Sequence, residues 1–145
     1  MTSKKNNASI SVIKQYIKDL SFENPLTTET ADSSITEQPK IDLSVDVGVK
    51  QLEQKDLYEV DLMVNLSSKA DDKVLFLAEL TYVGIFRLTI KEEEREPALL
   101  IFCPNLLFPF VRKIIADLTI EGGLPPLLLE PVDICRAPAD RKSVV

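Results

Sequence analysis

The chain has 145 residues, of which 45% are hydrophobic, and a formal net charge of −6 at pH 7. At this length it forms one domain. Because it contains no histidine and only two cysteines, Cys103 and Cys135, it can build neither a histidine-based catalytic arrangement nor a four-cysteine or mixed zinc site. We therefore expect no enzyme, no metal and no cofactor.

The first half of the chain carries the pattern of a sheet. Residues 9–17 predict a first strand, although their alternation is poor. Residues 41–49 and 58–66 carry an apolar side chain at every second position, with mostly polar ones between, which is typical of strands with one buried and one wet face. The polar residues between these two segments predict a connection between antiparallel neighbours.

A third clear strand follows, with a different character. Residues 74–80 are apolar on both faces, interrupted by Glu79, which predicts a central or interface strand. Residues 82–88 continue it, and Gly84 predicts a bulge or bend. The charge of Glu79 has two readings: an edge carboxylate that blocks strand-to-strand aggregation, or part of a partner site.

The second half predicts one helix. Residues 92–96 are expected to form a solvated turn into Pro97, and residues 105–120 a helix that is apolar around most of its circumference. A surface helix needs only one apolar stripe, so both sides of this helix must be covered, which favours a second subunit. Cys103, just before the helix, is interpreted as a small buried hydrophobe rather than a reactive thiol.

The length of the apolar stretches and the distribution of charge indicate where the protein is located and which partners it can bind. No stretch approaches the roughly 20 apolar residues that span a bilayer, and the polar start predicts no signal peptide, so we expect a cytoplasmic protein without integral membrane association. Between Glu29 and Asp61, nine acidic side chains stand against three basic ones, a balance of −6 that equals the charge of the whole chain. This acidic outer face serves solubility or docks a basic partner, and it disfavours nucleic acid, which needs a basic patch.

Five separated segments give a more specific indication. They are residues 18–25 (KDLSFENP), 38–39 (QP), 84–86 (GIF), 103–112 (CPNLLFPFVR), and 123–126 (GLPP) leading to 129–133 (LEPVD). With these the chain resembles the bacterial protein-export chaperones of the SecB family, from about residue 10 to residue 134. The resemblance implies an α+β fold in which a four-stranded antiparallel sheet packs with a long apolar helix at the subunit interface. It also implies a homotetramer, built as a dimer of dimers.

The resemblance further implies a chaperone domain over residues 1–134, in which residues 24–40 form a crossover loop beside the client groove. The family commonly has tryptophan just before the Gln-Pro pair, where this chain has Glu37. A second C-terminal helix is expected to be reduced or absent, because Pro138 would interrupt it. Residues 135–145 are expected to form a divergent, flexible tail.

Two sets of site residues follow. SecB-type chaperones pass clients to the export motor SecA through acidic residues on the sheet, and the matching positions are Asp19, Glu23 and Glu79, with Leu77 beside them. The candidates for a client groove are six apolar residues: Phe22, Leu26, Leu43, Phe102, Leu127 and Leu129.

The expected function is that of an ATP-independent holdase, which keeps precursor proteins unfolded and delivers them to SecA. No glycine-rich phosphate loop is present in the sequence. The alternative is a SecB-like adaptor dedicated to a single client, such as an antitoxin. An enzyme that uses Cys103, or the carboxylates of Glu23 and Glu79, is the least favoured interpretation.

Overall fold

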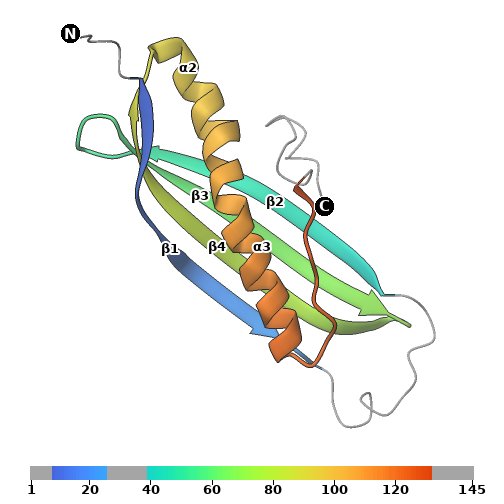
Figure 1. Cartoon of the computed structure of the whole chain (residues 1–145). Helices are drawn as coiled ribbons and strands as arrows, with labels where there is room; N and C mark the ends of the chain where they lie inside the picture. Colours follow the sequence, from blue (N-terminus) through green and yellow to red (C-terminus); the bar gives the residue numbers. More distant parts are fainter. Residues whose placement is uncertain (1–7, 26–38, 132–145) are drawn as a thin grey trace.

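A computed structural model describes residues 8–25 and 39–131 of the chain. Four strands come first and are followed by one continuous helix (Figure 1). The strands are β1 (Ser9–Glu23), β2 (Lys40–Gln51), β3 (Leu57–Ala70) and β4 (Lys73–Thr89), and the helix is built from α2 (Glu92–Pro97), the π-helical turn η1 (Ala98–Phe102) and α3 (Cys103–Glu121). The expected α+β fold with a four-stranded antiparallel sheet and a long helix is confirmed.

The strand order in the sheet is β1-β4-β3-β2, with every neighbouring pair antiparallel. The turn between β3 and β4 consists of Asp71 and Asp72, whose φ angles of 52° and 62° match the left-handed positions of a tight two-residue hairpin. The central-strand prediction for residues 74–80 is confirmed, because β4 lies between β1 and β3.

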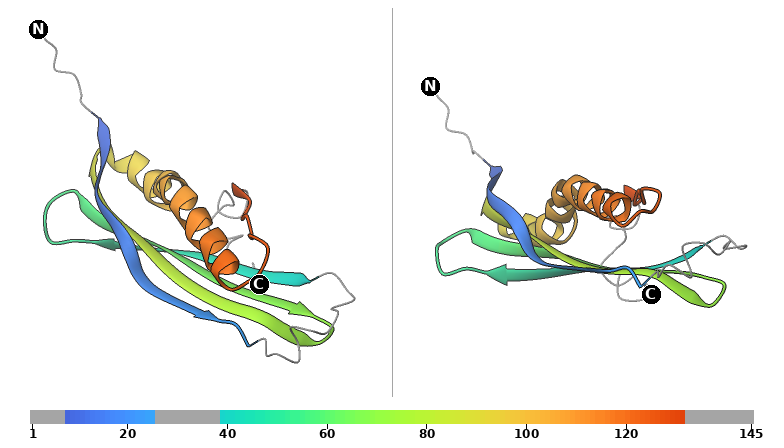
Figure 2. Two further views of the ribbon diagram at one scale, coloured as in Figure 1. Left: turned by 60° about the horizontal axis from the view of Figure 1, so that its bottom comes forward. Right: turned by 90° about the horizontal axis from the view of Figure 1, so that it is seen from below.

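The helix crosses one face of the sheet, and the segment after it returns on the same side (Figure 2). Alternate residues of β3 and β4, such as Leu62 and Leu80, point to the helix and are buried against Leu107, Val111 and Ile115. Residues 8–25 and 39–131 place no element over the opposite face of the sheet (Figure 2). We call this opposite side the open face; on β1 and β4 it carries Asp19, Ser21, Glu23, Leu77, Glu79 and Thr81.

Hydrogen bonds at both ends hold the helix on the sheet. Arg95 donates to the hydroxyl of Tyr58 over 2.7 Å and to Oδ1 of Asp56 over 3.0 Å, which ties the first turn to the start of β3. At the other end, the amide of Asn24 donates to the carbonyl oxygen of Gly122 over 2.7 Å. The two ends of the helix are therefore anchored at the start of β3 and just beyond the end of β1.

The helix is longer than the sequence pattern predicted. Residues 92–96 are solvated as expected, but the prediction that they form a turn is wrong, because they begin the helix. Three acidic side chains in the first turn interact favourably with the helix dipole, and Pro97 follows so soon that few backbone hydrogen bonds are lost. Residues 105–120 lie within α3, and the outer side chains of Leu106, Phe110 and Ile120 are exposed, as an apolar circumference predicts.

The whole helix, Glu92–Glu121, is long and apolar enough to cross a membrane by length and composition, with a mean hydropathy of 1.7 over 18 residues. The expectation that no stretch approaches that composition was therefore too strict. Within that window 44% is buried in the protein, and a helix that covers the core of a sheet passes the same test.

Of the bulge or bend predicted at Gly84, the bulge is wrong. β4 pairs with β3 without interruption there, with Val60 opposite Gly84, whereas the extra residues are in β1. Gly84 has a different role: a Cβ atom at this position would lie 2.6 Å from Cε1 of Phe86 and 2.9 Å from Cδ2 of Leu107. The missing side chain lets the helix approach the sheet closely.

Candidate functional site

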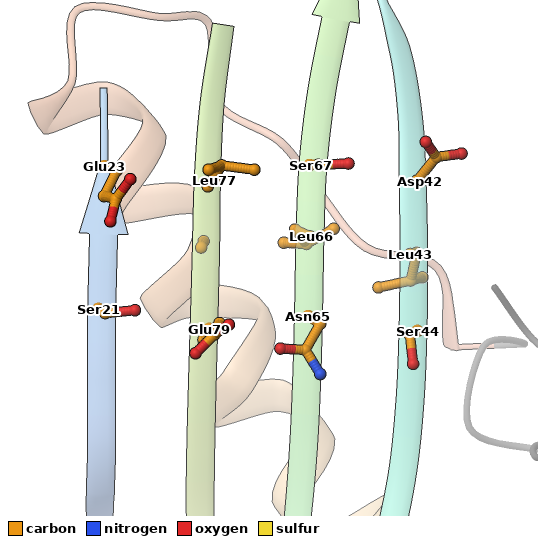
Figure 3. Close-up of a pocket in the computed structure, with 11 residues that line it drawn as sticks. Ser21, Glu23, Asp42, Leu43, Ser44, Asn65, Leu66, Ser67, Leu77 and Glu79 are labelled. Atoms are coloured by element: carbon orange, nitrogen blue, oxygen red, sulfur yellow. The ribbon is translucent and has the colours of Figure 1, made fainter. Parts of the chain in front are cut away.

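The four residues predicted to bind a partner lie together on the open face. Glu23 of β1 is directly opposite Leu77 of β4, and Asp19 is opposite Thr81, two residues along β4 from Glu79. Figure 3 shows Glu23, Leu77 and Glu79 on these two neighbouring strands, with the helix behind the sheet. The sequence separates Glu23 from Leu77 by more than fifty residues, and the pairing of β1 with β4 brings them into contact range.

Two irregularities in β1 decide which of its side chains reach the open face. The pairing with β4 shifts between Val12 and Lys14, and again between Ile17 and Asp19, so Ile13 and Lys18 are extra residues. Each extra residue reverses the alternation of the strand. Beyond Lys18, the odd-numbered residues therefore point to the open face and the even-numbered ones to the helix.

The side chains of Asp19, Glu23 and Glu79 are exposed, and Leu77 retains 38% of its accessible surface. An exposed leucine among carboxylates on a regular sheet offers a partner both apolar contact and negative charge. Glu79 is on a central strand, so the interpretation as an edge carboxylate against aggregation is wrong. What this surface binds stays a prediction.

A second charged cluster on the open face was not predicted from the sequence. Nζ of Lys18 lies 3.4 Å from Oε2 of Glu59 and 3.8 Å from Oδ2 of Asp61, both on β3. Burial, followed by a hydrogen bond to Glu59, raises the pKa of the Asp61 carboxyl, and the same hydrogen bond is the main cause that lowers the pKa of Glu59. The only signal for this cluster in the sequence is the broken alternation around Lys18.

The open face is hollowed next to Glu23. The hollow has a volume of about 350 Å³ and is bordered by side chains from all four strands (Figure 3). Short serine side chains, Ser21, Ser44 and Ser67, stand between longer neighbours and leave this space. It adjoins the predicted partner-binding residues and extends from them toward β2.

The candidate client-groove residues do not form one open groove in the protomer. Leu129 is buried in the core with 5% exposure, and Phe22 is half-buried and stacks on Phe76 with 5.8 Å between ring centroids. Leu43 and Leu127 are half-buried against the same core, and Leu127 donates its backbone N–H to Thr119 near the helix end.

Phe102 is different, since 48% of it is exposed and it lies 17 residues before Thr119, about 25 Å along the helix. Leu26 lies outside the described residues, as do residues 26–38 of the expected crossover loop and the expected tail at 135–145. The assignment of a client groove therefore stays a prediction.

The chemistry of the described side chains gives no support for catalysis by a thiol. Cys103 is fully buried, and burial raises the pKa of its thiol to about 12. It is protonated at neutral pH, so its interpretation as a small buried hydrophobe is confirmed. Within residues 8–25 and 39–131, no group of three or more acidic or cysteine side chains is placed to hold a metal ion.

The sequence of the chain is similar to those of known proteins. Residues 3–137 match the family model described as preprotein translocase subunit SecB. The chain is 48% identical over 130 residues to the protein-export protein SecB of Hyphomonas neptunium, covering 88% of this chain and 75% of the relative. It is 49% identical over 123 residues to that of Maricaulis maris, covering 84% and 70%.

The fold also matches a solved structure. The SecB-like chaperone of Mycobacterium tuberculosis, determined with a peptide from an antitoxin, superposes with a TM-score of 0.67 at 18% identity and covers 83% of this chain and 88% of its own. This likeness confirms the architecture of sheet and helix. The family model and the identity of close to half the aligned residues in curated relatives lead to one conclusion: the chain belongs to the SecB family of protein-export chaperones.

Proposed function

We propose that this protein is an ATP-independent holdase that binds unfolded precursor proteins and delivers them to the export motor SecA. The observation that carries the proposal is the grouping of Asp19, Glu23, Leu77 and Glu79 on the open face, at the positions that match the SecA-binding residues of the family. Carboxylates around an exposed leucine suit a basic partner segment, and such complementarity favours fast, salt-sensitive association.

The two faces of the sheet differ in chemistry, which supports binding of the client and of the motor at separate surfaces. Apolar side chains, including Phe22 and Leu43, point to the helix side, and the carboxylates point to the open face. A client on the helix side and a motor on the open face would not compete for the same atoms. Because capture precedes export, we place the protein in the cytoplasm.

Assembly into a homotetramer is part of the proposal. The outer surface of the helix exposes 48% of Phe102, 39% of Leu106 and 46% of Phe110. On β1, Val12, Ile17 and Leu20 point to the helix side but also remain 40–44% exposed. Apolar surface of this extent usually marks an interface, and closed symmetric assembly is the common way to bury it. Light scattering at micromolar concentration tests the assembly, and a stable particle at the chain mass of 16.2 kDa would contradict it.

The docking role is tested with Glu79→Lys. The segment of SecA that makes the contact is expected, from the family resemblance, to be its basic, zinc-stabilised C-terminal segment. Loss of one attraction and gain of one repulsion should weaken binding of this segment by on the order of 1–3 kcal/mol, and by less at high salt. The matched control is Asp46→Lys, which makes the same charge change at an exposed position of β2 on the same face. Calorimetric titration at two salt concentrations measures both variants. Normal binding by a correctly assembled Glu79→Lys protein would show that the assigned role is wrong.

The holdase role is tested separately, by the suppression of aggregation of a slow-folding client without nucleotide. Both variants should suppress aggregation as the unaltered protein does, because they change only exposed charges on the open face.

A SecB-like adaptor dedicated to one client remains the second candidate. It is favoured by the bound antitoxin peptide in the structurally similar chaperone of Mycobacterium tuberculosis, whereas relatives at 48–49% identity are protein-export proteins. Protection of several unrelated clients would support the holdase. Protection of a single partner, together with no binding of SecA, would support the adaptor.

A further inference from the structure

The hollow on the open face carries negative charge on two opposite sides. Glu23 and Glu79 border it from β1 and β4, and Asp42 borders it from β2 (Figure 3). Adjacent strands lie about 4.8 Å apart, so β1 and β2 are separated by about 14 Å across the sheet. A side chain seated in the hollow would therefore have a carboxylate on either side.

The residues between these carboxylates are neutral and mostly short. Leu77 supplies an exposed apolar wall, and Asn65 and Ser44 supply hydrogen-bonding groups. The lining includes no lysine or arginine. On the open face, the next pair toward the end of the sheet is Lys40 opposite Lys69, so a cationic side chain is repelled beyond Asp42 and attracted into the hollow.

We infer that the docking surface extends across the sheet to β2, and that the hollow receives a lysine or arginine side chain of the docking segment between Glu23 and Glu79 on one side and Asp42 on the other. The inference rests on the proposed function and adds to it a specific residue, Asp42, and a specific occupant. An apolar residue beside that cation contacts Leu77. The carboxylates on both sides favour a basic occupant, and the volume of about 350 Å³ leaves room for a lysine or arginine side chain to enter the hollow.

Two pairs of variants test this inference. Asp42→Asn removes one charge with almost no change in shape, and the matched control Asp46→Asn does the same on the same strand and face but outside the hollow. In titrations with a synthetic peptide of SecA's C-terminal segment, loaded with zinc, Asp42→Asn should weaken binding about three- to tenfold at about 50 mM salt and less at about 500 mM. Asp46→Asn should stay within about twofold of the unaltered protein.

The depth of the hollow is tested without any change of charge. Ser44→Leu places a larger side chain on β2 in the lining of the hollow, fills part of its space and should weaken binding by a similar factor. The control Ser11→Leu places the same side chain on β1, away from the hollow, and should leave binding unchanged. Normal binding by Asp42→Asn or by Ser44→Leu overturns the inference, as does equal weakening by Asp42→Asn and Asp46→Asn. If Glu79→Lys binds normally as well, the proposed docking function itself is wrong; if Glu79→Lys is weakened, that function stands and only the extension to β2 is lost.

Discussion

Nζ of Lys18 in β1 lies 3.4 Å from Oε2 of Glu59 in β3, so it reaches across the intervening strand β4 on the open face. Lys18 is also the extra residue that reverses the alternation of β1. This ion pair thus lies at the irregularity that sends Asp19 and Glu23 to one face and Leu20 and Phe22 to the other.

Deletion of Lys18 should lower the stability of the folded protein far more than the substitution Lys18→Ala. Without the extra residue, part of β1 must turn its apolar side chains to solvent, at a cost on the order of 2–3 kcal/mol for Phe22 alone. Lys18→Ala loses only an exposed ion pair and should cost less than about 1 kcal/mol. Denaturant unfolding measures both, and equal stability of the two variants would show that β1 tolerates either register.

Gly84→Ala should destabilise the protein by about 1–3 kcal/mol, because the new methyl group meets the buried rings and methyls of Phe86 and Leu107. Gly48→Ala is the control within the same sheet, since its added Cβ would lie 3.4 Å from Cε of Met63 and 3.7 Å from Cβ of Asp61. We expect Gly48→Ala to be neutral or slightly stabilising. Thermal unfolding of both variants decides; a neutral Gly84→Ala would mean that the helix shifts outward without cost.

Asp61→Asn should stabilise the protein at neutral pH by about 1 kcal/mol, because it removes the charge of a carboxyl whose ionised form is disfavoured by burial. The pKa of Asp61 is raised in the folded state, so its protonated form is favoured by folding below the ordinary value of 3.8, and this contribution is lost as the pH rises through the folded pKa.

The stability difference between Asp61→Asn and the unaltered protein should therefore be small in acid and grow toward neutral pH. The asparagine amide can donate to Glu59 at every pH, as the Asp61 carboxyl does only when it is protonated. The cause that lowers the pKa of Glu59 is therefore retained in the variant. Unfolding at a series of pH values measures the difference, which should not be constant across the series.

Cys103 should resist thiol reagents in the folded protein. With a pKa of about 12, about one thiol in ten thousand is ionised at pH 8, and the sulfur has no exposed surface. A Cys135→Ser protein leaves Cys103 as its one cysteine for the assay. Rapid labelling before denaturant is added would contradict the buried position.

The alternation of residues 41–49 and 58–66 was sufficient to predict β2, β3 and their acidic outer side, because period-two patterns report burial directly. The same reasoning missed the end of β1 at Glu23, since two extra residues disturb its period. It also placed the irregularity at Gly84, where glycine serves close packing rather than a bulge. The interpretation of Glu79 as an edge charge failed for a related reason: strand order is a long-range property, and no local pattern shows that β4 is central.

The position of the helix at the end of the described fold has a consequence for biosynthesis. All four strands precede it in the chain, and its 30 residues supply the cover for the apolar side of the sheet. At about 5–20 residues per second, a ribosome needs about 1.5–6 s to add this segment after β4 is complete. During that interval the nascent chaperone exposes the kind of surface that it is proposed to bind in its clients, so its own synthesis passes through a client-like stage.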